Sequence, residues 1–139
     1  MTWFQQILVW LVAIHLVVWA WVWLVPTLVV RVDRIYAGAL GLALPGLIFL
    51  QREAPASVLR HELQHVRQLR RYSPIGASVL LAWHYASAAI RRRQSSGRWP
   101  SFWSLWAENP LEIEANQAMR QNSPLPRHWI LGQPLDRCD

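Results

Sequence analysis

The chain has 139 residues, 53% of them hydrophobic, and a formal net charge of +6, which suits one domain with an additional apolar segment. Its single cysteine, Cys138, excludes a disulfide within the chain. All 14 basic residues are arginines at position 31 or later. We interpret this charge as contact with anionic lipid rather than with nucleic acid, because the arginines accompany the apolar segments.

Residues 7–30 form an apolar run without a formal charge. A helix over this run would reach roughly 36 Å, enough to cross a membrane. The run is too long for a signal peptide, and no small-x-small cleavage site comes after it. Arg31 and Arg34 come directly after the run, and the positive-inside rule then places the remainder of the chain in the cytoplasm. We expect a single-pass protein of a bacterial-type inner membrane, with residues 1–30 as a transmembrane anchor and 31–139 as a cytoplasmic domain.

Residues 35–50 allow two interpretations. A second membrane crossing is one, and it would move the rest of the chain to the other side. However, Pro45-Gly46 is a turn signal and would break a helix in its middle. We therefore favour two short strands, roughly 37–43 and 46–51.

The sequence HELQH, residues 61–65, is the most informative motif. On a helix, His61 and His65 lie one turn apart on the same face and can bind one zinc ion together. Glu62, between them, can reach a water molecule on that ion. This motif is the signature of zinc peptidases of the zincin class.

The helix that carries this motif should begin near Pro55, a helix breaker, or Ser57, a suitable N-cap, and it should end before Pro74. A second apolar helix is expected over residues 75–90, either packed on the first or lying along the membrane interface. Residues 94–103 are expected to form a loop.

A catalytic zinc needs three protein ligands and one open position. Downstream candidates for the third ligand are Glu108, Glu112, Glu114, His84 and His128. The stretch 109–120 has Pro110 in its first turn and then strong helix formers. Glu112 and Asn116 share one face of this helix, and Glu114 points away, outward or toward a salt-bridge partner. Glu112 can ligate the metal while Asn116 hydrogen-bonds a ligand histidine, with Glu114 as the alternative ligand.

Two motifs, HELQHVRQ at 61–68 and NPLEIEA at 109–115, together carry a resemblance to a known family. They resemble minimal gluzincin-type zinc metallopeptidases, in which HExxH is followed by ExxxD, as in the heat-shock membrane peptidases and the CAAX-prenyl proteases. The run AGALGLALPGLIFL is similar to the strand pair that precedes the active helix in those proteins. The likeness spans roughly residues 36–120. It implies an α+β fold, a small zincin-like domain of mostly helices with a short strand pair before the active-site helix.

Carried over residue by residue, the resemblance implies that His61, His65 and Glu112 are ligands of Zn²⁺. It also implies that Glu62 is the general base. Asn116 stands where the family has Asp. An amide oxygen can still accept a hydrogen bond from a ligand imidazole, but it adds no negative charge.

The resemblance implies a membrane-tethered zinc metallopeptidase that hydrolyses peptide or protein substrates with a zinc-activated water. Because His65 and Glu112 must meet on one ion, the chain between them crosses the bilayer an even number of times, and we expect no crossing. The strand near 46–51, if it edges the cleft, would hold an extended peptide by strand addition. Candidates for stabilising the oxyanion are His84, Tyr72 and Tyr85.

Two other interpretations stay open. The first is a non-enzymatic zinc-binding membrane scaffold of the same fold. The second is an arginine-rich, membrane-associated protein without a metal, which would bind anionic lipid or another membrane protein. The tail beyond residue 126 is expected to be irregular.

Overall fold

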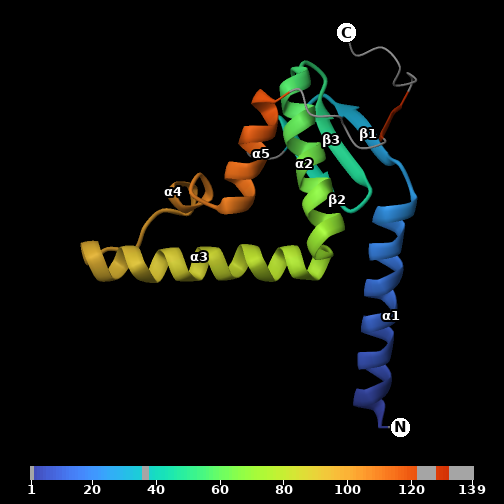
Figure 1. Ribbon diagram of the computed structural model, residues 1–139, viewed down its shortest axis with the longest axis horizontal. Helices are drawn as coiled ribbons and strands as arrows, with labels where there is room; N and C mark the ends of the chain where they lie inside the picture. Colours follow the sequence, from blue (N-terminus) through green and yellow to red (C-terminus); the bar gives the residue numbers. More distant parts are fainter. Residues whose placement is uncertain (1, 36–37, 122–127, 132–139) are drawn as a thin grey trace.

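The chain has an α+β arrangement, as expected, in which the strands β1 to β3 are consecutive and are followed by the helices α2 to α5 (Figure 1). The computed structural model describes residues 2–35, 38–121 and 128–131. The elements are α1 (Trp3–Leu24), β1 (Thr27–Val32), β2 (Gly41–Leu44), β3 (Leu47–Gln51), α2 (Ala56–Tyr72), α3 (Pro74–Ser96), α4 (Phe102–Trp106), α5 (Pro110–Arg120) and β4 (His128–Ile130).

The strands form one small sheet in the order β2-β3-β1-β4. β1 is parallel to both β3 and β4, whereas β2 and β3 pair as an antiparallel hairpin. The hairpin matches the expected pair of strands, although the first strand begins at Gly41 rather than near residue 37. Residues 36–37 lie outside the described part, and the described residues that follow them up to Leu50 form no membrane-spanning helix. At the turn, Gly46 has φ +76°, which favours glycine. A Cβ there would lie only 2.6 Å from Trp21 Nε1, so the turn packs tightly against α1.

The apolar run 7–30 is not one helix, contrary to expectation, because α1 ends at Leu24 and the run continues into β1. Pro26 cannot continue a helix, and it disfavours helical geometry at the preceding residue. Accordingly, Val25 is extended, with φ −99° and ψ 135°. The boundary expected at residue 30 therefore falls within β1.

Three further boundaries differ from the sequence-based expectation. α2 begins at Ala56 with Pro55 at the N-cap, so Ser57 does not cap it. α3 continues to Ser96 and shortens the loop expected at 94–103. That loop also ends early, because α4 begins at Phe102.

β4 lies in the tail for which an irregular structure is expected from the sequence. It pairs with the first half of β1, between Thr27 and Val29. A strand of this length is stabilised mainly by its neighbour in the sheet, so its own sequence carries little signal.

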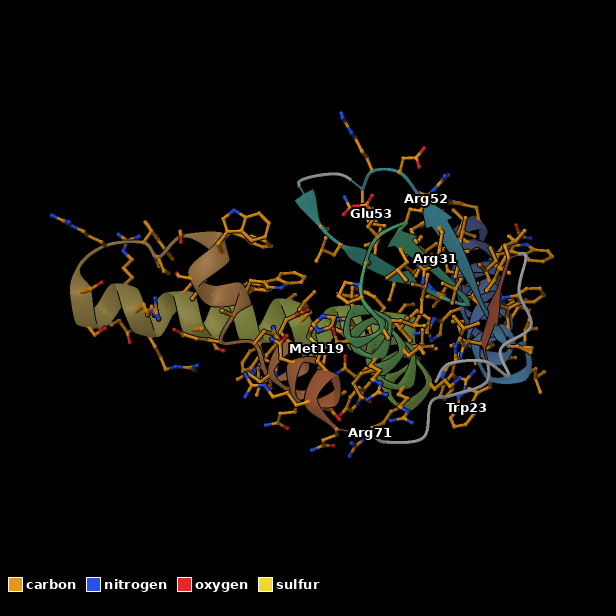
Figure 2. The ribbon with its side chains drawn as sticks, turned by 90° about the horizontal axis from the view of Figure 1, so that it is seen from above. Trp23, Arg31, Arg52, Glu53, Arg71 and Met119 are labelled. Atoms are coloured by element: carbon orange, nitrogen blue, oxygen red, sulfur yellow. The ribbon has the colours of Figure 1, made fainter. Side chains whose placement is uncertain are left out.

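The hydrophobic core lies between α2 and the sheet, with one contribution from α1. Its buried members are Val22, Val29, Ile48, Leu50, Ala54, Val58, Leu59, Leu63 and Val66. α5 packs beside α2, and its Met119 lies against this core (Figure 2). α2 also contacts β2. The two histidines of the HELQH motif, on α2, line a cavity together with residues of β2 and α5.

The C-terminal half of α1 is attached to the end of α2 by hydrogen bonds. The indole nitrogens of Trp19 and Trp23 donate to the backbone oxygen of Arg70, at 3.0 and 3.1 Å. Arg70 Nε donates in return to the backbone oxygen of Val22 at 2.8 Å. Among the described residues, α1 is the one helix long and apolar enough to cross a membrane, by length and composition. Its N-terminal part projects away from the domain (Figure 1).

Candidate metal centre

Three side chains from two helices converge on one point. His61 Nε2 lies 3.1 Å from His65 Nε2 and 3.4 Å from Glu112 Oε2. His65 Nε2 lies 3.3 Å from Glu112 Oε1. Tetrahedral zinc, with bonds of about 2.0–2.1 Å, places neighbouring ligand atoms roughly 3.3 Å apart. Each histidine faces a different oxygen of the Glu112 carboxylate, and one ligand atom from each of the three side chains lies within 4.8 Å of the other two. This triangle of side chains is close enough to hold a metal ion.

Local structure explains why these donors meet. His61 and His65 are one turn apart on α2, so their rings project from the same face. Glu112 is in the first turn of α5. That turn is fixed by Asn109, the buried N-cap residue, whose Oδ1 accepts a hydrogen bond from the Leu111 backbone N–H at 2.9 Å. The expected spacing of ligands on both helices is thus realised in three dimensions.

The electrostatics of the triangle keep its carboxylate ionised. Burial would raise the pKa of Glu112, but hydrogen bonds from His61 and His65 lower it to about 2. For His65, burial would lower the pKa, yet its hydrogen bond with Glu112 and the charge of that carboxylate raise it. An ionised, nearly fully buried carboxylate beside two imidazoles is the donor set that divalent metals such as zinc prefer.

Gln68 orients His65, a role that the sequence did not suggest. The Nδ1–H of His65 donates to Gln68 Oε1 at 2.8 Å, which turns Nε2 of the ring toward the centre. The amide nitrogen of Gln68 donates to Glu114 Oε2 and to the backbone oxygen of Leu111, both at 2.9 Å. These two bonds fix which end of the amide faces the imidazole.

Glu114 has a different place from the one expected. Its two carboxylate oxygens accept hydrogen bonds from Gln64, at 3.0 Å, and from Gln68, and it forms no ion pair with a cation in the part of the chain that the structure describes. Glu114 therefore joins α5 to α2 and supports the ligand set from behind. Glu112, not Glu114, lies at the metal centre.

Asn116 lies at the cavity wall, and its side chain is exposed. The hydrogen bond expected from Asn116 to a ligand histidine is not formed within the described residues. His65 Nδ1 binds Gln68, and the buried Nδ1 of His61 has no partner in that part of the chain. Gln68 of α2 thus forms the hydrogen bond to a histidine that was expected from Asn116 of α5.

Replacing Gln68 with methionine keeps the volume of this side chain and removes both its acceptor and its donor. We expect zinc affinity to fall about 10–100-fold, because His65 loses the bond that fixes its tautomer and ring. Gln64→Met is the matched control, since Gln64 contacts Glu114 but no ligand histidine. Competition with a zinc chelator measures both variants. Equal affinities would show that Gln68 does not position His65.

Glu62 lies beside the triangle, against the edge strand β2. It is buried, and the backbone N–H of Ala43 donates a hydrogen bond to its carboxylate. A Cβ on Gly41 would lie 2.5 Å from Glu62 Oε1, so only glycine leaves room for the carboxylate there. Burial raises the pKa of Glu62, although the nearby His65 and His61 act in the opposite direction. A raised pKa suits a group that exchanges protons near neutral pH.

A cavity of about 730 Å³ opens in front of these residues. Its apolar lining comes from β2, α2, α3, α4 and α5, and includes Leu40, Leu42, Val58, Leu81, Trp106 and Met119. The strand at its edge is β2, not the expected strand 46–51. β3 is paired on both sides, by β2 and β1, whereas β2 is the terminal strand of the sheet.

Three further residues expected at the site, one as a metal ligand and two as stabilisers of an oxyanion, lie in different surroundings. Glu108 forms an ion pair with Arg92 at the surface and is not a metal ligand here. The guanidinium carbon of Arg71 lies over the ring of Tyr72, 5.2 Å from the ring centroid. The hydroxyl of Tyr85, in contrast, is buried without a hydrogen-bond partner in the described ranges. Burial, and to a smaller extent the charge of Glu112, raises the pKa of Tyr85 to about 12.

Comparisons with protein-family models, with curated proteins and with solved structures found no match to this chain. The function is therefore inferred from geometry. The main element of that geometry is a histidine pair and a distant carboxylate on a common centre, with a second carboxylate beside them.

Proposed function

We propose that this protein is a membrane-tethered zinc metallopeptidase of the gluzincin type. The observation that carries the proposal is the convergence of His61, His65 and Glu112 on one point, with Glu62 next to it. Metal sites that only stabilise a fold are usually closed by four protein ligands, whereas hydrolytic sites have three and an open position. The triangle has three donors and faces a cavity.

His61, His65 and Glu112 would hold the ion. When bound, zinc would act as a Lewis acid that makes a water molecule acidic and polarises a carbonyl group. Glu62 would take the proton of that water and later deliver it to the leaving nitrogen of the peptide. Its burial, raised pKa and hydrogen bond to Ala43 hold the carboxylate ready for this exchange. Tyr85 would be the candidate for stabilising the oxyanion, because its buried hydroxyl has no hydrogen-bond partner within the described ranges.

The free edge of β2 would hold the substrate. An extended peptide can add to a terminal strand through backbone hydrogen bonds, and side-chain pockets then give specificity. β2 lies at the rim of the cavity, next to Glu62. Because the cavity lining is mainly apolar, a peptide with large apolar residues beside the cleaved bond fits it best.

α1 would anchor the protein in a membrane, with the domain on the cytoplasmic side of a bacterial-type inner membrane. The arginine that contacts α1 belongs to α2: Arg70 bonds the end of α1. Arg31, which comes after the apolar run in sequence, donates instead to the backbone oxygen of Arg52 at 2.6 Å. In Figure 2 these two arginines lie together, apart from Trp23 of α1. The charge beside the membrane would therefore come from the C-terminal end of α2, including Arg70 and Arg71.

Peptide cleavage by purified full-length protein tests the proposal. We expect zinc-loaded protein to cleave peptides rich in large apolar residues, a chelator to stop cleavage, and added zinc to restore it. Protein that binds zinc but cleaves no peptide in a diverse library would instead support the non-enzymatic scaffold. Protein without zinc would support the arginine-rich membrane protein.

A further inference from the structure

α3 presents an apolar stripe to the outside of the molecule. Ile75, Val79, Trp83 and Ile90 are 56, 61, 68 and 51% exposed. Their spacing of four and seven residues places them on one face of the helix. Exposed apolar side chains are ordinary when scattered, but a continuous stripe on one helix face marks an interaction surface.

The stripe lies on the side of α3 that faces away from the domain. Residues two positions further along a helix lie about 200° around its axis. Ala77, two positions after Ile75, is buried, and Leu81, two after Val79, lines the cavity. Tyr85, two after Trp83, stacks on Phe102 of α4 with ring centroids 5.1 Å apart. One face of α3 thus forms part of the cavity wall while the opposite face is uncovered.

The direction of α1 indicates what covers this face. In Figure 1, α3 runs across the direction of α1. The sheet, α2, α4 and α5 all lie on one side of α3, and the N-terminal part of α1 projects on the other side. The hydrogen bonds between α1 and Arg70 fix this arrangement, since α3 begins directly after α2. If α1 crosses a bilayer, α3 lies along the surface of that bilayer with its stripe toward the lipid.

The C-terminal end of α3 has the charges that such a surface attracts. Arg91, Arg93 and Arg98 are exposed, and within the described ranges none has an acidic partner; only Arg92 of this group does, in Glu108. Arg93 lies over the ring of Trp99 at 4.4 Å. Arginine and tryptophan are the side chains that bridge headgroups and hydrocarbon at a membrane interface.

We propose that α3 is an interfacial helix that binds the surface of an anionic lipid bilayer through this stripe and these arginines. The inference rests on the membrane attachment in the proposed function, but on neither the metal nor hydrolysis. It has a consequence for the site: because α3 lines the cavity with its other face, the cavity lies about one helix diameter, ~10 Å, above the lipid. A substrate would then be bound close to the membrane surface.

The test uses the full-length protein with Cys138→Ser and one new cysteine, labelled with an environment-sensitive fluorophore. The cysteine replaces Val79 in the stripe, Leu11 in α1, or Gln117, an exposed residue of α5 that serves as the matched control. The protein is reconstituted into vesicles of phosphatidylcholine with phosphatidylglycerol. We expect the Leu11 and Val79 labels to resist iodide and to be quenched by a quencher attached to lipid chains, and the Gln117 label to behave in the opposite way.

Each other outcome has a defined meaning. A Val79 label open to iodide beside a protected Leu11 label would refute the interfacial helix and leave the anchor intact. If Leu11 is also open to iodide, the anchor of the proposed function fails as well. A Val79 label that resists iodide but is not quenched from the lipid would show a protein contact, such as a second copy, and would overturn the proposal.

A further variant separates the contribution of the arginines to lipid binding from that of the apolar stripe. Changing Arg91, Arg93 and Arg98 together to glutamine should reduce protection of the Val79 label in the phosphatidylglycerol vesicles to the level in phosphatidylcholine alone. Unchanged protection would overturn the assignment to anionic lipid.

Discussion

Replacing Glu112 with glutamine is expected to remove nearly all bound zinc from this protein. The change keeps the shape of the side chain but removes the negative charge that lies 3.3–3.4 Å from both imidazoles. The loss of affinity should exceed the roughly 10–100-fold caused by loss of an outer hydrogen-bond partner, because a ligand itself is removed. Zinc analysis after dialysis, together with chelator competition, measures the effect.

Glu114→Gln is the matched control for this variant. Glu114 is two residues away on the same helix and supports Gln68 and Gln64 without contacting either histidine. We expect it to weaken zinc binding far less than Glu112→Gln does. If Glu114→Gln proves the more damaging change, the two carboxylates have exchanged roles and the assignment of the third ligand is wrong.

Replacing Glu62 with glutamine is expected to abolish peptide hydrolysis while zinc still copurifies. The amide keeps the size of the carboxylate and can still accept the hydrogen bond from Ala43, but it cannot take a proton from water. General-base catalysis typically contributes about 10²–10⁴-fold, so the rate of cleavage should fall at least that far. The zinc content should stay at the wild-type level, because Glu62 is not among the three donors.

Glu53→Gln controls for a general effect of removing a carboxylate, since Glu53 is exposed in the turn between β3 and α2. It should leave both cleavage and zinc content unchanged. Equal activity of the Glu62→Gln variant and the wild type would refute the general-base role. Loss of zinc in that variant would show instead that Glu62 belongs to the ligand set.

The parts of this protein that could be predicted from its sequence are those set by local geometry. The relation of His61 to His65 comes from the pitch of one helix, and the hairpin comes from Pro45-Gly46. The α5 helix could also be predicted, because Pro110 at its start and Glu112 in its first turn are local signals of a helix N-terminus. These local rules predicted the histidine pair and placed Glu112 among the candidates for the third side chain, with Glu114 as the alternative; the resemblance to gluzincins also favoured Glu112.

Other parts depend on contacts between distant segments, and the sequence does not encode them locally. A central strand of a sheet and a transmembrane helix both need an apolar run, so β1 could not be separated from the run that precedes it. β2 is an edge strand because β1 pairs with the other side of β3. No local sequence pattern predicts that pairing. The role of Gln68 depends on where Leu111 and Glu114 lie on α5. Only the i, i+3 spacing from His65 could have suggested it.

The cavity in front of the candidate metal centre and the proposed lipid contact use opposite faces of one helix, α3. α3 lines the cavity with Ala77 and Leu81 and leaves Val79 and Trp83 exposed. A hydrolytic site next to an interfacial helix would select substrates by location as well as by sequence. The labelling experiment and the zinc experiments are independent, so either proposal can fail alone.

The most direct test is the zinc content of purified full-length protein beside that of a His61→Ala variant that retains the wild-type helical content. The triangle of His61, His65 and Glu112 predicts about one zinc per wild-type chain and almost none in the variant. Wild-type protein without zinc after purification in zinc-containing buffer, or a variant with as much zinc as the wild type, would contradict the metal centre.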